Sequence, residues 1–144
     1  MKKISVLLAA LLLLGFWGIN LSGKKKSKQM LTMEQVENLN RKYIAWFNAG
    51  KVDSLLMMYG ENSCTGVSFC GKEQIKMHFF AELGKGYKFE ELNALSLHCS
   101  DTLAVETGSW RIRFEDNAEL SGVYMTEWHY NGKGWYVAND IASY

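Results

Sequence analysis

Side chains that could transfer protons lie close together near the C-terminal end of the sequence. Glu127, His129 and Asp140 fall in two strand-like runs that are joined by residues 131–134. With a four-residue loop, Glu127 and Asp140 become diagonal neighbours roughly 7–8 Å apart, and two carboxyl groups at that separation could do the acid and base work of glycoside hydrolysis. Glu127 could also orient His129 as a general base. No other feature of a sugar site is visible, and we expect His129 to be solvated or at an interface.

The two runs predict a closing β-hairpin over residues 122–144. Tyr, Thr, Trp and Val favour a pleated surface, and Asn131-Gly132 supplies the backbone angles of a tight turn. Opposed residues share a face, so a two- or four-residue loop puts one set together: Tyr124, Thr126, Trp128, Trp135, Val137, Asn139 and Ile141. The other face then carries Val123, Met125, Glu127, His129, Tyr136, Ala138 and Asp140. A three-residue loop would exchange the sets of the second strand.

Aromatic side chains supply the second kind of candidate site. An aromatic-walled cavity with a few orienting polar groups would suit an apolar or aromatic small molecule. The alternative is that the same rings simply fill the core, with their polar atoms bonded to backbone. The wall candidates are Tyr43, Tyr59, Phe79, Trp110, Tyr124 and Trp128, and the polar candidates are Thr126, Asn139 and His78.

Composition and motifs exclude several classes of function. The 144 residues are 48% hydrophobic, enough for one well-formed core, and the net charge of +1 gives no reason to expect a nucleic-acid partner. No phosphate-binding loop, nucleophile elbow or cluster of metal ligands is present, so we predict neither a metal nor a cofactor. Cys64, Cys70 and Cys99 allow at most one intrachain disulfide, and three buried free thiols are the preferred interpretation.

The first residues predict export or membrane attachment. Lys2-Lys3 and the apolar run that follows form a secretory signal within residues 1–23, and the uncharged stretch over residues 4–23 is also long enough to span a bilayer if it is not cleaved. Residues 24–31 form a basic linker, and residues 32–144 form the domain. We therefore expect a periplasmic, extracellular or membrane-anchored protein.

The remaining pattern predicts an α+β domain with three helices ahead of an antiparallel meander. Thr32 and Gln35 form a capping box before a helix over 32–48, a short helix follows over 52–59, and a third helix begins at Gly71. A first strand is expected over 62–69. Four further strands are expected over 87–98, 103–114, 119–130 and 135–143, with the helices gathered on one face of a curved sheet.

Four segments in this order resemble the nuclear transport factor 2-like superfamily, which includes SnoaL-like cyclases and ketosteroid isomerases. They are YIAWFNAGK (43–51), LMMYGEN (56–62), GKEQI (71–75) and the closing hairpin. The hairpin is most similar to SnoaL-like members without an assigned activity. The resemblance implies a cone-shaped sheet that encloses a pocket with its helices, and frequently a homodimer.

The resemblance also permits a check against the ketosteroid isomerase mechanism, which uses a tyrosine, a carboxylic acid and a general base. Tyr43 falls at the position of the oxyanion-binding tyrosine. Val67 falls at the position of the base and Thr126 at that of the second acid, so that mechanism is not expected here. The alignment places Glu127 and Asp140 outside the pocket. We therefore expect a small-molecule-binding domain, with a SnoaL- or isomerase-type enzyme that uses Tyr43, or an interaction module, as alternatives.

Overall fold

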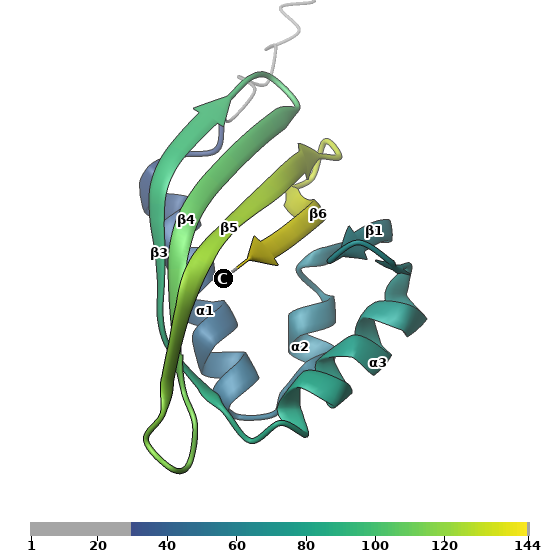
Figure 1. The fold of residues 1–144 in the computed structure, drawn as a ribbon. Helices are drawn as coiled ribbons and strands as arrows, with labels where there is room; N and C mark the ends of the chain where they lie inside the picture. The colour runs from purple at the N-terminus through teal and green to yellow at the C-terminus, as the bar shows by residue number, and fades with distance from the viewer. Residues whose placement is uncertain (1–29, 144) are drawn as a thin grey trace, which may run out of the picture.

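Three helices and six strands build residues 30–143, the part of the chain that the computed structural model describes (Figure 1). The predicted α+β class and the three helices are confirmed. In chain order the elements are α1 (Met33–Asn48), α2 (Val52–Leu56), β1 (Tyr59–Thr65), β2 (Phe69–Cys70), α3 (Lys72–Leu83), β3 (Lys88–Cys99), β4 (Leu103–Arg113), β5 (Glu119–Tyr130) and β6 (Trp135–Ser143).

Helix α1 begins at the predicted capping box. The Thr32 hydroxyl accepts a hydrogen bond from the Gln35 backbone N–H, and the Gln35 side chain accepts one from the Thr32 backbone N–H. These reciprocal bonds satisfy N–H groups that have no partner inside the helix. The helix buries Val36, Asn40 and Phe47 and packs on the concave side of the curved sheet (Figure 1). It thereby brings both an apolar surface and the polar Asn40 to the interior.

The sheet has the order β2-β1-β6-β5-β4-β3 in the described residues. Strands β3 to β6 form the predicted antiparallel meander, with regular pairing along the whole of β4 and β5. Strand β1 lies next to β6 and parallel to it, a pairing that the sequence does not predict. The second helix also stops earlier than predicted, at Leu56, so β1 begins at Tyr59 and places that tyrosine at the start of a buried strand.

A β-bulge interrupts the closing hairpin. Tyr130 pairs with Trp135 across a four-residue loop, and Trp128 pairs with Val137, but Glu127 pairs with Asn139, so Ala138 is an extra residue on β6. Successive residues of a strand point to opposite faces, and one inserted residue therefore exchanges the faces of everything beyond it. From Asn139 onward, β6 presents the opposite set of side chains to the one that the sequence predicts.

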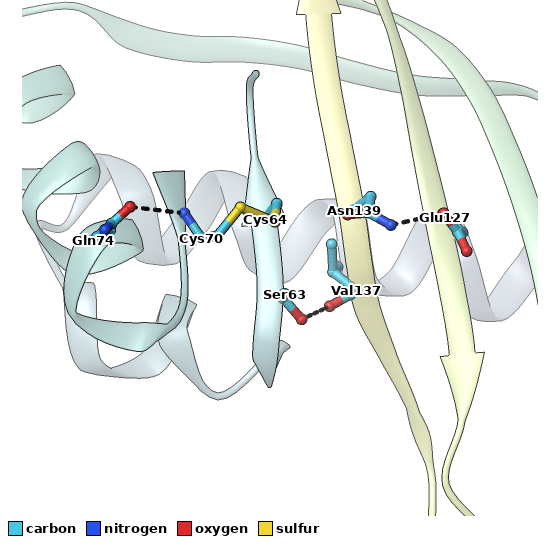
Figure 2. Close-up of a disulfide and its surroundings, with 7 residues drawn as sticks. All are labelled: Ser63, Cys64, Cys70, Gln74, Glu127, Val137 and Asn139. Carbon is cyan, nitrogen blue, oxygen red and sulfur yellow. Dashed lines mark hydrogen bonds between the residues drawn. A yellow bond between two sulfur atoms is a disulfide. The ribbon is translucent and has the colours of Figure 1, made fainter. Parts of the chain in front are cut away.

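A disulfide between Cys64 in β1 and Cys70 in β2 links the edge strand of the sheet to its neighbour (Figure 2). Cys99 is a partly buried free thiol. The interpretation of all three cysteines as buried thiols is therefore wrong. Neighbouring strands bring Cys64 and Cys70 into direct register, and Cys99 lies on β3 at the other edge of the sheet.

The predicted signal or anchor, residues 1–23, and most of the basic linker lie outside the described residues. Within residues 30–143, no helix is both long enough and apolar enough to cross a membrane.

Candidate functional site

A cavity of about 390 Å³ lies between the concave face of the sheet and the helices. Eight of the nine predicted site residues line it: Tyr43, Tyr59, His78, Phe79, Trp110, Tyr124, Thr126 and Trp128. The walls are mainly aromatic and aliphatic, and the volume falls in the range of pockets that hold small molecules. The rings that the sequence offers for a cavity therefore do surround one, although they also carry much of the core.

Asn139 and Asp140 exchange the positions that the sequence predicts for them. The Asn139 side chain is exposed and donates a hydrogen bond to Glu127 Oε2, 2.8 Å away, on the outer face (Figure 2). Asp140 pairs with Thr126 in β5 and lines the cavity. The cause is the extra residue Ala138. The predicted role of Asn139 in the cavity is wrong, as is the outward placement of Asp140, whereas Glu127 does lie outside.

Asp140 brings a carboxyl group to the cavity wall. Its Oδ2 accepts a hydrogen bond from the Tyr59 hydroxyl at 2.9 Å. Its Oδ1 is buried and has no hydrogen-bond partner among residues 30–143. Burial raises the pKa of Asp140 to about 6, and the hydroxyls of Thr65 and Tyr59 oppose that rise in part by stabilising the charged form. A carboxyl group with such a pKa can both accept and release a proton near neutrality.

Two tyrosines share this end of the cavity with Asp140. The rings of Tyr43 and Tyr59 both pack against Phe79, with centroid separations of 6.1 and 5.7 Å. Burial raises the pKa of each tyrosine well above 10, and the Asp140 charge raises both further. Both phenols are therefore neutral hydrogen-bond donors at physiological pH. Helix α1, strand β1 and strand β6 thus place two phenol hydroxyls and one carboxyl group at the same end of the apolar cavity.

Glu106 supports the sheet side of the wall, two strands from Asp140 in the same cross-strand row, and was not predicted. It is fully buried in β4; its Oε1 accepts from Asn40 Nδ2 at 2.8 Å and from the Tyr124 hydroxyl, and its Oε2 accepts from Trp128 Nε1 at 2.9 Å. These bonds stabilise the buried carboxyl group and fix three side chains that line the cavity. The signal in the sequence was alternation, since Glu106 shares its strand face with Trp110.

Polar groups of α3 and the following loop gather at another part of the lining. Glu82 accepts hydrogen bonds from Lys85 Nζ and the Tyr87 hydroxyl, both at 2.8 Å. Burial opposes ionisation of Glu82, but these two bonds together with the charges of Lys85 and His78 lower the pKa of the carboxyl group. Burial lowers the pKa of His78, against the raising effect of Glu82, so its imidazole is neutral at pH 7. The negative charge of Glu82 is therefore balanced by the positive charge of Lys85.

Solved structures of known fold share this architecture at low sequence identity. A putative calcium/calmodulin-dependent protein kinase II association domain from Xanthomonas campestris superposes with a TM-score of 0.64 at 18% identity, covering 76% of this chain and 84% of that one. An NTF2-like protein of unknown function from Pseudomonas putida gives 0.67 at 16% identity, with 77% and 84% covered. The chain has the nuclear transport factor 2-like fold.

A further structure with the same architecture is described as having a cystatin-like fold. An NTF2-like protein with a cystatin-like fold from Novosphingobium aromaticivorans gives a TM-score of 0.63 at 14% identity, covering 76% of this chain and 79% of that one. The sequence matches no protein-family model and no curated protein. At these identities the likeness shows the nuclear transport factor 2-like fold, and the chemistry depends on the residues of this chain.

On this nuclear transport factor 2-like sheet, Glu127 and Asp140 lie on opposite faces, so they do not form the acid–base pair of a glycosidase. Glu127 Oε1 instead contacts His129 Nε2 at 2.5 Å on the outer face, as the sequence allows. In the cavity, the carboxylate that the isomerase comparison failed to find comes from β6, where Asp140 pairs with Thr126. No group of three or more metal-ligating side chains occurs within residues 30–143.

Proposed function

We propose that this domain binds a small, mainly apolar molecule in the cavity between its sheet and helices. The observation that carries the proposal is a 390 Å³ cavity with aromatic walls whose lining includes the Asp140 carboxyl group. Burial of apolar surface on binding supplies free energy, and a few polar groups fix the orientation of the ligand. Asp140, Tyr43 and Tyr59 are the polar groups proposed to contact it.

Binding is tested by screening apolar and aromatic compounds against the full chain by thermal shift and native mass spectrometry. Trp110 and Trp128 line the cavity, so a bound compound should also change the tryptophan fluorescence. The variant Ala142→Trp places a large ring at an exposed position of the lining, and it should abolish any stabilisation that a compound produces.

The matched control is Ala81→Trp, an exposed position of α3 that does not line the cavity. It should leave binding unchanged. A compound that stabilises the Ala142→Trp variant as strongly as the unmodified chain binds elsewhere, and that result would contradict the proposal.

A second candidate is an enzyme that moves a proton on a bound carbonyl compound. It is favoured by the pKa of about 6 at Asp140 and by two neutral phenols in the same cavity. Asp140 would act as the base, and Tyr43 would donate a hydrogen bond to the carbonyl oxygen. Nuclear magnetic resonance in D₂O tests this, because deuterium should enter next to the carbonyl of an added ketone. Full exchange by an Asp140→Asn or a Tyr43→Phe variant would exclude it.

We also propose that the chain is exported or membrane-anchored through residues 4–23 and that it forms a homodimer. The outer sheet face supports the dimer, since Val123, Met125 and Ile141 are exposed there by 59%, 48% and 42%. The same face, with Glu127 and Tyr136, would serve a different partner if the domain is an interaction module. Analytical ultracentrifugation of the chain and of a Met125→Glu variant tests the dimer, and a monomer at high concentration would exclude it.

A further inference from the structure

The charges around the cavity are unbalanced. Its lining contains three side chains that carry charge at pH 7, Glu82, Lys85 and Asp140. His78 also lines the cavity but is neutral at this pH. Lys85 is bound to Glu82 at 2.8 Å. No Lys, Arg or His side chain among the described residues forms an ion pair with Asp140. The Asp140 carboxylate is therefore the charge of the lining that lacks a counterion within residues 30–143.

The immediate surroundings of Asp140 suit a cation better than a neutral or anionic group. Oδ1 has no hydrogen-bond partner in the described part of the chain, and a buried charge without a partner is costly. The aromatic rings of Tyr43, Tyr59 and Phe79 pack together at this end of the cavity, and their faces attract cations. An anionic ligand would meet the Asp140 charge without a compensating basic group.

We propose that the ligand carries a protonated amine on an apolar or aromatic body, with the ammonium group paired to the Asp140 carboxylate. This inference rests on the proposed small-molecule site and names the chemical class that the site accepts. The ammonium group would donate hydrogen bonds to the carboxylate and lie against the neighbouring aromatic faces, while the body of the ligand occupies the apolar part of the cavity. Tyr59 would hold the carboxylate in place through its bond to Oδ2.

The interaction should depend on pH in a defined direction. The titratable side chains that line the cavity with Asp140 are Tyr43 on α1, Tyr59 on β1, His78 and Glu82 on α3, Lys85 and Tyr87 after it, and Tyr124 on β5. Glu106 on β4 is separated from Asp140 in the sheet by Thr126. The four tyrosines stay neutral below pH 8 because their pKa values are raised. Loss of the Asp140 charge below about pH 6 should therefore weaken amine binding, while a neutral ligand should be less affected.

Calorimetric titration of the full chain with three probes of similar shape tests the proposal: naphthylethylamine, naphthylethanol and naphthylacetate. At about pH 7.5 the amine should bind roughly tenfold or more tightly than the alcohol, because a charge-assisted hydrogen bond is stronger than a neutral one. The acetate should bind most weakly. At about pH 5 the preference for the amine should fall by roughly tenfold, in proportion to the ionised fraction of Asp140.

The variant Asp140→Asn should lose the preference for the amine and still bind the alcohol, and circular dichroism would establish that it folds. Glu127→Gln is the matched control, because this carboxylate lies on the outer face and should not influence the preference. Equal binding of amine and alcohol by the unmodified chain, or a preference that survives in Asp140→Asn, would overturn the inference while leaving the small-molecule site intact. Failure of all three probes to bind would count against both proposals.

Discussion

The Asp140→Asn substitution should stabilise the folded protein at neutral pH. Folding raises the pKa of Asp140 from its ordinary value of 3.8 to about 6. Each pKa unit corresponds to about 1.4 kcal/mol, so keeping this carboxyl group ionised in the folded state costs about 3 kcal/mol above pH 6. Asparagine carries no charge and keeps an oxygen for the Tyr59 hydroxyl, but its amide N–H groups also need partners. We expect a net gain of about 1–3 kcal/mol in the free energy of unfolding.

The raised pKa of Asp140 also makes the free energy of unfolding depend on pH in a defined direction. A carboxyl group with a raised folded-state pKa favours the folded state fully below the pKa of the unfolded chain, and that contribution is lost as the pH rises through about 6. The stability of the unmodified chain should therefore fall between about pH 4 and pH 6 relative to that of Asp140→Asn. Below about pH 4 the two proteins should be nearly equal, because Asp140 is then protonated in both states.

Urea unfolding followed by tryptophan fluorescence at pH 4, 5, 6, 7 and 8 measures the difference. Glu127→Gln is a control with the opposite direction, because hydrogen bonds from Asn139 and His129 lower the pKa of Glu127, so its contribution is lost as the pH falls. Equal stability of Asp140→Asn and the unmodified chain at pH 7.5, or a difference that does not shrink towards pH 4, would refute the reasoning that burial makes ionisation of Asp140 unfavourable in the folded protein.

Three further sets of variants test contacts that hold the fold around the site, each by urea unfolding. Glu106→Leu leaves three buried donors without their acceptor and should cost about 3–5 kcal/mol, whereas Glu106→Gln, which keeps one acceptor oxygen, should cost less. Gly108→Ala should cost about 2 kcal/mol or more, because the added Cβ would lie 2.3 Å from Asn93 O, and Gly134→Ala, which meets open space, should be neutral. A Cys64→Ser, Cys70→Ser double variant should have a free energy of unfolding about 2 kcal/mol below that of the unmodified chain under oxidising conditions, because the disulfide closes a short loop. Under reducing conditions the two proteins should be equally stable, because neither then has the disulfide. A smaller loss for Glu106→Leu than for Glu106→Gln, an unchanged Gly108→Ala, or insensitivity to reductant would each contradict the corresponding contact.

Local patterns were sufficient for much of the architecture. The Thr32–Gln35 capping box begins α1, the glycine at position 71 precedes α3, and the alternating runs form β4 and β5 with nearly the predicted limits. Capping, turn residues and side-chain periodicity are interactions between near neighbours, so they can be inferred from the sequence. The early end of α2 at Leu56 and the parallel pairing of β1 with β6 depend on contacts between distant segments, and they were not predicted.

The sequence by itself determined that the chain ends in a β-hairpin and identified six of the aromatic rings that surround the cavity, but it left the length of the hairpin loop open. Only the tertiary structure decided which carboxylate enters the cavity. A single extra residue, Ala138, turns Asp140 inward and Asn139 outward, because strand side chains alternate and a bulge shifts that alternation by one. The bulge lies where β6 pairs with both β5 and β1, so its position is set by strands from the two ends of the fold, and no local pattern within β6 specifies it.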